Sequence, residues 1–229
     1  MMLGDIYVTK ANLNKKQIKQ IKKRFPCIKT ICQIYGVSGE FRKPKIRKLF
    51  GKSTTTLHKE HGISYNLDVA KVMFSQGNHF EKKRMMNLVK PTDVIVDMFA
   101  GIGYFTIPIA KKVKHIYAIE KNPESYEFLE QNIRQNYLSN VTAIKSDCRK
   151  VKHGNIADRI IMGYFPGTKK FLPAALKLAK KHCVIHYHEI SDNVKDILKQ
   201  LPEDAKVLNI RTVKSYSPKK NHYVIDFKL

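Results

Sequence analysis

From residue 93 onward, short apolar runs alternate with segments whose apolar positions recur every three to four residues. The runs predict buried strands at residues 94–98, 115–120, 141–145, 159–162 and 183–188. The periodic segments predict helices over residues 101–113, 123–137, 170–180 and 193–201. Two alternating segments at residues 206–214 and 223–227, about a turn at 217–221, predict a closing hairpin. This order predicts an α/β fold, with a mostly parallel sheet that is covered on both faces and closes in a C-terminal antiparallel hairpin.

The first part of the chain has a different pattern. Residues 14–25 predict a short basic helix, with an apolar stripe at Ile18, Ile21 and Phe25. Short extended pieces follow at residues 28–35 and 46–50. Residues 54–60 and 63–68 predict a hairpin about His61 and Gly62. We therefore expect a small basic α+β domain over residues 1–68, followed by a catalytic domain over residues 69–229.

A further helix is predicted just after this boundary. Asn78 and Glu81 have the spacing of a capping box, with Asn in place of Ser or Thr. Its apolar face consists of Phe80, Met85, Leu88 and Val89. This helix would lead into the first strand of the sheet.

The charge of the chain is high and unevenly distributed. Lys and Arg number 43 against 19 Asp and Glu, which gives a net charge of +24 over 229 residues. Residues 1–60 carry fifteen basic and three acidic side chains, so half of the excess lies in about a quarter of the chain. A basic module beside a more balanced one is typical of enzymes that act on nucleic acids. The alternative is a lysine-rich solvated surface.

Other compositional signals exclude several classes of protein. No apolar run approaches the roughly 18 residues that a membrane span needs. The N-terminus lacks a signal-peptide core, since Asp5 interrupts it. The four cysteines include no CxxC pair, so neither a disulfide framework nor a zinc site is indicated. We expect a soluble, cytoplasmic monomer without a metal and without a membrane partner.

The end of the first predicted strand carries a glycine turn. Residues 97–103 read DMFAGIG, and Gly101 and Gly103 allow the backbone to approach a ligand closely. A dinucleotide fingerprint requires a third glycine three residues beyond Gly103, where this chain has Thr106. A complete dinucleotide-binding fingerprint is therefore absent.

Two acidic residues end the next two predicted strands. Glu120 lies nineteen residues after Gly101, where a carboxylate can accept both hydroxyls of a ribose. Asp147 follows the third strand, where it can accept from the exocyclic amine of an adenine. Together with the glycine turn, these acids predict an adenosine site without a pyrophosphate cradle. S-adenosylmethionine is the cofactor that fits this pattern.

At this point a family resemblance is visible. Residues 97–103, followed by Ile107 and Pro108, resemble the cofactor motif of enzymes that modify position 37 of tRNA. This group contains guanine-N1 methyltransferases and aminocarboxypropyltransferases of the wybutosine pathway. The resemblance implies a class I methyltransferase-like Rossmann fold with a mostly parallel seven-stranded sheet. Upstream residues that agree with it are His58, Lys59, Glu60, His61, Gly62, Asp68, Lys71, Phe74 and Ser75.

Two segments indicate which branch of the group is present. The methyltransferases carry an Asn-x-Pro-type loop after the fourth strand, whereas residues 162–168 read MGYFPGT and contain no asparagine. Residues 171–176 and 185–188 resemble the aminocarboxypropyltransferases. The resemblance therefore implies transfer of the 3-amino-3-carboxypropyl group of S-adenosylmethionine to C7 of 4-demethylwyosine at position 37 of tRNA-Phe, with methylthioadenosine as by-product. The alternatives are a guanine-N1 methyltransferase and a tRNA-binding module without catalytic activity.

The resemblance also implies roles for individual residues. Positions matching Glu120, Asp147 and Cys148 hold the adenosine in the family, and Gly101 belongs to the turn beside it. Positions matching Ser75 and Lys82 hold the amino acid arm, although relatives often have arginine instead of Lys82. Lysine is a point charge and cannot form arginine's bidentate clamp on a carboxylate.

Four residues near the later strand ends are candidates for substrate contact. They are Tyr164, Pro166, His186 and His188. The two histidines lie two residues apart on a predicted strand and therefore face the same way; structural roles for them are the alternative. We assign no general base and no catalytic nucleophile, because Cys148 has no obvious base beside it.

Overall fold

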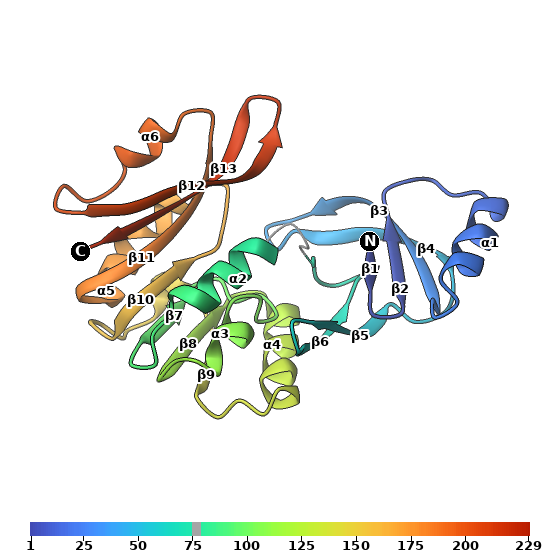
Figure 1. Cartoon of the computed structure of the whole chain (residues 1–229), viewed down its shortest axis with the longest axis horizontal. Helices are drawn as coiled ribbons and strands as arrows, with labels where there is room; N and C mark the ends of the chain where they lie inside the picture. Colours follow the sequence, from blue (N-terminus) through green and yellow to red (C-terminus); the bar gives the residue numbers. More distant parts are fainter. Residues whose placement is uncertain (75–78) are drawn as a thin grey trace.

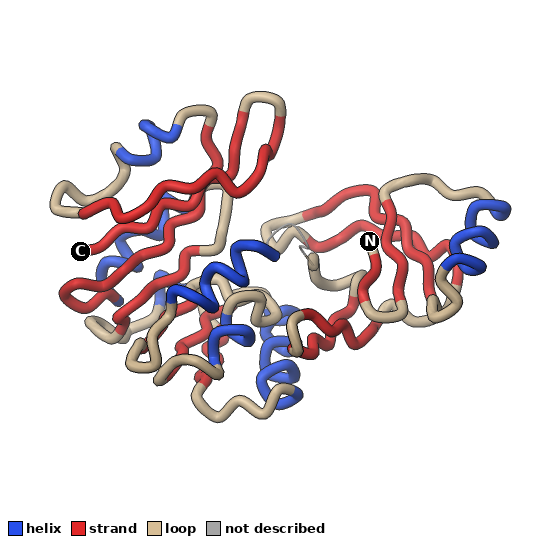
Figure 2. The backbone as a smooth tube through the Cα atoms, in the orientation of Figure 1, coloured by secondary structure: helices blue, strands red, loops and turns tan. Residues whose placement is uncertain are grey.

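The computed structural model describes residues 1–74 and 79–229, which form two lobes joined by a hairpin (Figure 1). The smaller lobe carries a four-stranded sheet and one helix, and the larger lobe carries a seven-stranded sheet with its helices. Strands dominate both lobes (Figure 2). The expected domain boundary at residue 68 falls at the end of the hairpin and stays a prediction.

The smaller sheet has the order β1-β2-β3-β4, with β2 and β3 parallel and the other neighbours antiparallel. Its elements are β1 (Met2–Leu3), β2 (Ile6–Thr9), α1 (Lys15–Arg24), β3 (Thr30–Ser38) and β4 (Lys43–Phe50). Helix α1 begins with a capping box, because Asn14 accepts from the backbone of Gln17 and the Gln17 side chain accepts from the backbone of Asn14. The pattern predicted α1, β3 and β4, but not β1 and β2.

The hairpin consists of β5 (Thr55–Glu60) and β6 (Ile63–Asp68), and its turn is at His61 and Gly62 as predicted. Alternate residues of β6, namely Ile63, Tyr65 and Leu67, are buried. They belong to a hydrophobic core that also contains residues of β1, β2 and the larger sheet. The hairpin therefore joins the two lobes through continuous apolar packing.

Two asparagines attach the hairpin to the larger lobe: Asn132 lies in α4 (Pro123–Gln135), and Asn136 is the C-terminal cap of that helix. Asn132 accepts from the backbone N–H of Asn66 at 2.6 Å and donates to its carbonyl at 3.2 Å. Asn136 accepts from Ser64 at 3.0 Å and donates to it at 2.7 Å. These side chains satisfy backbone groups on the free edge of β6, which would otherwise be buried without partners.

Replacing Asn132 by alanine is expected to lower the free energy of unfolding by about 2–4 kcal/mol. The fully buried side chain also donates to the carbonyl of Ile102 at 2.9 Å, so its loss leaves three backbone groups unpaired, two of Asn66 and one of Ile102. Urea unfolding followed by circular dichroism measures this change. Gln131→Ala, on the exposed face of the same helix, is the control and should change stability by less than about 0.5 kcal/mol; an equal effect of the two variants would contradict the anchoring role.

The larger sheet has the order β12-β13-β11-β10-β7-β8-β9. Its strands are β7 (Val94–Asp97), β8 (His115–Glu120), β9 (Val141–Lys145), β10 (Ala157–Met162), β11 (Ala179–Ser191), β12 (Lys206–Ser217) and β13 (Lys220–Lys228). Strands β9, β8, β7, β10 and β11 are parallel, and β13 and β12 add an antiparallel hairpin beside β11. This architecture confirms the predicted fold class. The strand order reverses between β7 and β10, where open α/β sheets bind their ligands.

The helices after residue 100 are shorter than expected; residues 179–180, expected to be helical, begin β11, and the largest difference falls at residues 101–113. They are α2 (His79–Leu88), α3 (Thr106–Ala110), α4, α5 (Leu172–Leu178) and α6 (Val194–Leu198), with short 3-10 turns η2 (Cys148–Lys150) and η3 (Thr168–Phe171). The helix predicted over residues 101–113 is wrong for its first part, because Gly101 and Gly103 have φ of 59° and 99°. Those left-handed conformations belong to a turn and cannot continue a right-handed helix. The described residues contain no helix that is both long and apolar enough to cross a bilayer.

Candidate cofactor site

The glycine turn lies between β7 and α3 and is organised by a buried acid. Asp97 ends β7, accepts from the Thr106 hydroxyl at 2.8 Å and lies 3.4 Å from the backbone nitrogen of Phe99. Burial raises the pKa of Asp97 to about 6, although the hydrogen bond from Thr106 opposes that rise. Thr106, where the dinucleotide fingerprint would have glycine, therefore serves to hold the turn. A Cβ at Gly103 would lie 2.4 Å from Ile107, so only glycine fits there.

Gly103→Ala is expected to lower the free energy of unfolding by about 2–4 kcal/mol, and to weaken cofactor binding with it. The left-handed backbone costs about 1–2 kcal/mol for a residue with a Cβ, and crowding against Ile107 adds to it. Thermal unfolding and calorimetric binding measure both effects. Gly154→Ala is the matched control, because its added Cβ makes only an ordinary contact at 3.5 Å and its φ is not positive. Similar losses of stability in both variants would contradict a specific requirement for glycine at position 103.

Glu120 ends β8 and is bound to the glycine turn through backbone hydrogen bonds. Its two carboxylate oxygens accept from Gly101 N–H at 2.7 Å and from Asn122 N–H at 2.6 Å. A carboxylate has about four lone-pair positions, so each oxygen can still accept one further hydrogen bond. Two ribose hydroxyls match that remaining capacity. The ribose contact expected of Glu120 stays a prediction, and this geometry fits it.

As pH is lowered, cofactor binding is expected to weaken at a higher pH than it would if the ribose acceptor were an exposed glutamate. Burial raises the pKa of Glu120, while the backbone hydrogen bonds lower it by less, so the net shift is upward. Only the ionised form has free acceptor positions for both expected hydroxyls, so affinity should be present above the raised pKa and lost as pH falls through it. Calorimetric titrations over a pH series measure this. An affinity that stays constant through the acid range where the protein remains folded would contradict the assignment.

Asp147 and Cys148 lie at the end of β9, beside Glu120. Asp147 caps η2 through Arg149 N–H at 3.0 Å, and its carboxylate contacts the Arg149 guanidinium at 2.6 Å and Lys121 Nζ at 3.4 Å. The hydrogen bond from Arg149 is the main cause that holds the pKa of Asp147 well below its usual range. Burial raises the pKa of the Cys148 thiol to about 12, so at neutral pH it is protonated and a poor nucleophile. Adenine contacts by this pair stay predictions.

Backbone pairing brings these strand ends together at one edge of the sheet. Ala100 N–H donates to the carbonyl of Ile119 at 2.9 Å, and Ser146 N–H donates to the carbonyl of Glu120 at 3.1 Å. The glycine turn, Glu120 and Asp147 are therefore neighbours, as their positions in the sequence predicted.

Lys82 lies in an environment that the sequence did not predict. The side chain is buried in α2, and Nζ lies 3.1 and 3.0 Å from the two carboxylate oxygens of Glu60 on β5. The rings of Phe74, Tyr65 and Tyr104 surround it, with centroids 4.7, 5.6 and 5.9 Å away. Burial lowers the pKa of Lys82, and Glu60 opposes that shift. Its expected role in holding the amino acid arm stays a prediction, and Ser75, like Asn78 of the expected capping box, lies outside the described residues.

Tyr104 connects Lys82 with the glycine turn. Its ring lies against Gly101, where an added Cβ would be 2.5 Å from Cε2, and against Phe74 with ring centroids 5.6 Å apart. Burial raises its pKa, and the charge of Glu120 adds to that shift. Tyr104 therefore packs both beside Lys82 and against the glycine turn whose Gly101 N–H donates to Glu120.

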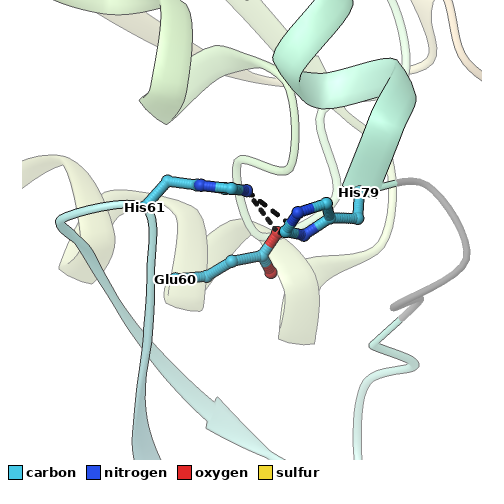
Figure 3. A group of neighbouring side chains, drawn as sticks. All are labelled: Glu60, His61 and His79. Atoms are coloured by element: carbon cyan, nitrogen blue, oxygen red, sulfur yellow. Dashed lines mark hydrogen bonds and ion pairs between the residues drawn. The ribbon is translucent and has the colours of Figure 1, made fainter.

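Glu60 is the centre of a group of polar side chains on the hairpin and α2. His79 Nδ1 lies 3.3 Å from Glu60 Oε1, and His61 Nε2 lies 3.2 Å from His79 Nδ1 (Figure 3). Burial raises the pKa of Glu60, but His58, Lys82 and His79 lower it more, to about 2. The carboxylate is therefore ionised throughout the neutral range. Sequence reasoning missed this group because His79 is separated from the other members by 18 residues.

The loop after β10 contains the first two candidate substrate contacts. Tyr164 stacks on Phe99, with centroids 5.1 Å apart and an angle of 27° between the rings. Pro166 follows Phe165 through a cis peptide bond. The Phe165 ring lies 4.0 Å from that of His222 on β13. This loop lies at the same end of the sheet as the glycine turn.

The basic β3–β4 turn of the smaller lobe reaches that end of the sheet. Its contacts are Glu40 Oε1 to Lys121 Nζ at 2.6 Å, Arg42 Nη1 to the carbonyl oxygen of Phe165 at 3.3 Å, and Lys43 Nζ to Glu124 Oε2 at 3.1 Å. Exposed ion pairs of this kind contribute little stability. They do place the basic lobe directly beside the candidate site, which the sequence pattern could not reveal.

His186 and His188 are both fully buried on β11. His186 Nδ1 lies 2.5 Å from Asp226 and its Nε2 lies 2.8 Å from Arg159. His188 Nδ1 lies 3.0 Å from His222 Nε2, while the other nitrogen of each of these two rings has no partner among the described residues. Burial lowers the pKa of both predicted histidines. They face the same way, as expected, and their contact with substrate stays a prediction.

The fold and the three adjacent strand ends define the class: a class I methyltransferase-like Rossmann protein with an additional basic lobe. Residues 56–213 match the TRM5/TYW2 methyltransferase domain, and the chain belongs to this family. A relative in Methanocaldococcus jannaschii, named tRNA(Phe) (4-demethylwyosine(37)-C(7)) aminocarboxypropyltransferase, is 44% identical over 99% of this chain and 96% of its own length.

Solved structures agree with this assignment. The crystal structure of M. jannaschii TYW2 in complex with AdoMet has a TM-score of 0.82 at 38% identity, covering 99% of this chain and 96% of that one. The complex of aTrm5 and tRNALeu has a TM-score of 0.90 at 35% identity, covering 99% of this chain and 70% of that one. Both branches that the sequence resembles therefore share this architecture.

Proposed function

We propose that this chain transfers the 3-amino-3-carboxypropyl group of S-adenosylmethionine to C7 of 4-demethylwyosine at position 37 of tRNA-Phe. The observation that carries the proposal is the similarity to the M. jannaschii aminocarboxypropyltransferase over almost the full length of both chains. The loop at residues 162–168, which lacks the asparagine of the methyltransferases, supports the same branch.

The residues at the strand ends fit the donor. Glu120 would accept the two ribose hydroxyls, Asp147 would accept from the adenine amine, and the backbone of Cys148 would contact the ring. Gly101, without a Cβ, makes room for the Tyr104 ring, and its N–H holds Glu120 beside the proposed ribose position. When bound, the sulfonium supplies an activated carbon: a bond forms between C7 and the γ-carbon, the sulfur–carbon bond breaks with its electrons to sulfur, and the C7 proton is released.

The distinctive task of this chain is to select one of three carbons on the sulfonium. Selection depends on orientation, because the carbon that is presented to the acceptor is the one that reacts. Lys82 would hold the carboxylate of the arm, and its aromatic surroundings and Glu60 fix the position of Nζ. Lys82 therefore acts in our proposal as the residue that sets regiochemistry by positioning the arm.

The basic lobe is proposed to hold the tRNA. Its charge attracts phosphates, and its β3–β4 turn lies beside the strand ends where the chemistry would occur. We further propose that the tRNA is tRNA-Phe carrying 4-demethylwyosine, that the enzyme acts as a monomer, and that it does so in the cytoplasm.

A guanine-N1 methyltransferase is the second candidate, because the aTrm5 complex with tRNALeu has a similar fold. The small-molecule product distinguishes the two activities. After incubation with S-adenosylmethionine and substrate tRNA, we expect methylthioadenosine by liquid chromatography and mass spectrometry. S-adenosylhomocysteine as the main product would assign the chain to the methyltransferases, and no product would favour a binding module.

A further inference from the structure

The side chains of Glu60, His61 and His79 converge on one point at the surface between the hairpin and α2 (Figure 3). The distances between the three nearest atoms are 3.2 Å for His61 Nε2 to His79 Nδ1, 3.3 Å for His79 Nδ1 to Glu60 Oε1, and 3.8 Å for His61 Nε2 to Glu60 Oε1. One oxygen and two nitrogens thus form a nearly regular triangle.

This triangle has the size of one face of a zinc coordination tetrahedron. Zinc binds histidine nitrogen and carboxylate oxygen at about 2.0–2.2 Å, so tetrahedral ligands lie about 3.3–3.5 Å apart. Two of the observed edges fall within about 0.1 Å of that range, and rotation of the exposed His61 side chain can shorten the third. The fourth position would face solvent, since His61 and His79 are exposed.

The surroundings of Glu60 also suit a ligand carboxylate. Its Oε2 accepts from Lys82 Nζ at 3.0 Å and lies 3.8 Å from His58 Nε2, which leaves Oε1 directed at the two imidazoles. Outer hydrogen bonds of this kind orient metal-ligating carboxylates in proteins. Lys82 Nζ also lies 3.1 Å from Oε1, so the ion would have to share that oxygen with the lysine.

We propose that Glu60, His61 and His79 form a binding site for a divalent zinc ion. Two imidazoles and one carboxylate favour zinc over magnesium and calcium, which prefer ligand sets made of oxygen alone. The ion links the turn of the hairpin to the first residue of α2, and so fixes the separation of residues 61 and 79. The proposal does not rest on the proposed function, although Glu60 is shared with Lys82.

Calorimetric titration of zinc chloride into the full chain, after treatment with EDTA and desalting, tests the site. We expect one ion per chain, and an affinity at least about tenfold weaker in His61→Ala and in His79→Ala. His153→Ala, an exposed histidine of the larger lobe, and Cys27→Ser, an exposed thiol, are controls that should bind as the unmodified protein does. Circular dichroism establishes that each variant is folded.

A second readout separates metal binding from a hydrogen-bonded cluster. Zinc should raise the thermal midpoint of the unmodified protein and of both controls, but not of His61→Ala or His79→Ala. Absence of stoichiometric zinc binding would overturn the proposal. Zinc binding that is lost in Cys27→Ser, or that is unchanged in both histidine variants, would overturn it as well.

Discussion

Replacing Glu120 by alanine is expected to weaken binding of S-adenosylmethionine at least about a hundredfold. In the proposed complex the variant would lose two hydrogen bonds from ribose hydroxyls to a charged acceptor, each of about 1.5–3 kcal/mol. Every 1.4 kcal/mol is a factor of about ten in affinity. It also removes the acceptor that holds the N–H groups of Gly101 and Asn122. The variant therefore loses the contacts with the cofactor and the hydrogen bonds that position the glycine turn at the same time.

Isothermal titration calorimetry with S-adenosylmethionine measures this loss directly. Glu127→Ala, an exposed glutamate of the neighbouring helix α4, is the matched control and should bind normally. Because Glu120 would contact the ribose and not the arm, methylthioadenosine should lose affinity by the same factor. An affinity for S-adenosylmethionine that is unchanged in folded Glu120→Ala would remove Glu120 from the site.

Replacing Lys82 by alanine is expected to weaken binding of S-adenosylmethionine about 10- to 100-fold and to leave binding of methylthioadenosine unchanged. The difference arises because methylthioadenosine lacks the carboxylate that Lys82 would bind, and a charged hydrogen bond contributes about 1.5–3 kcal/mol. Lys82→Arg should retain transfer, since arginine keeps a positive charge and hydrogen-bond donors for a carboxylate at this position. Titration of each variant with both ligands measures the difference.

Because Lys82 is paired with Glu60, a second variant is needed to separate loss of arm binding from loss of stability. Alanine at position 82 leaves the largely buried Glu60 carboxylate without its nearest cation, and this alone can destabilise the fold. Glu60→Gln combined with Lys82→Met removes both charges, so the double variant should fold and bind methylthioadenosine normally. If it also bound S-adenosylmethionine normally, Lys82 would have a structural role only.

The sequence was informative wherever a local pattern determines the structure. Buried runs with intervening periodic segments predicted the larger sheet, and acids at strand ends became neighbours because parallel strands end at one edge. The shorter α3 shows the limit of periodicity, since Gly101 and Gly103 occupy left-handed conformations that an apolar pattern does not reveal. Strands β1 and β2 escaped prediction because two and four residues are too short for a reliable alternation.

The missing features of the site are contacts between distant segments. Glu60 with Lys82, and Arg42 with the carbonyl of Phe165, join residues that are 22 and 123 positions apart. Nothing in local spacing indicates such pairs, because they depend on how the hairpin and the smaller lobe pack against the sheet. The same reason explains why His186, predicted from its strand position alone, proved to lie in a buried network with Asp226.

Mass spectrometry of tRNA-Phe that carries 4-demethylwyosine, after incubation with the protein and S-adenosylmethionine, tests the central claim most directly. The proposed function predicts that the modified base gains the mass of one aminocarboxypropyl group, and that tRNA with unmodified guanosine at position 37 gains nothing. A gain of one methyl group on the unmodified guanosine, with no change in the 4-demethylwyosine substrate, would contradict the account and identify a methyltransferase.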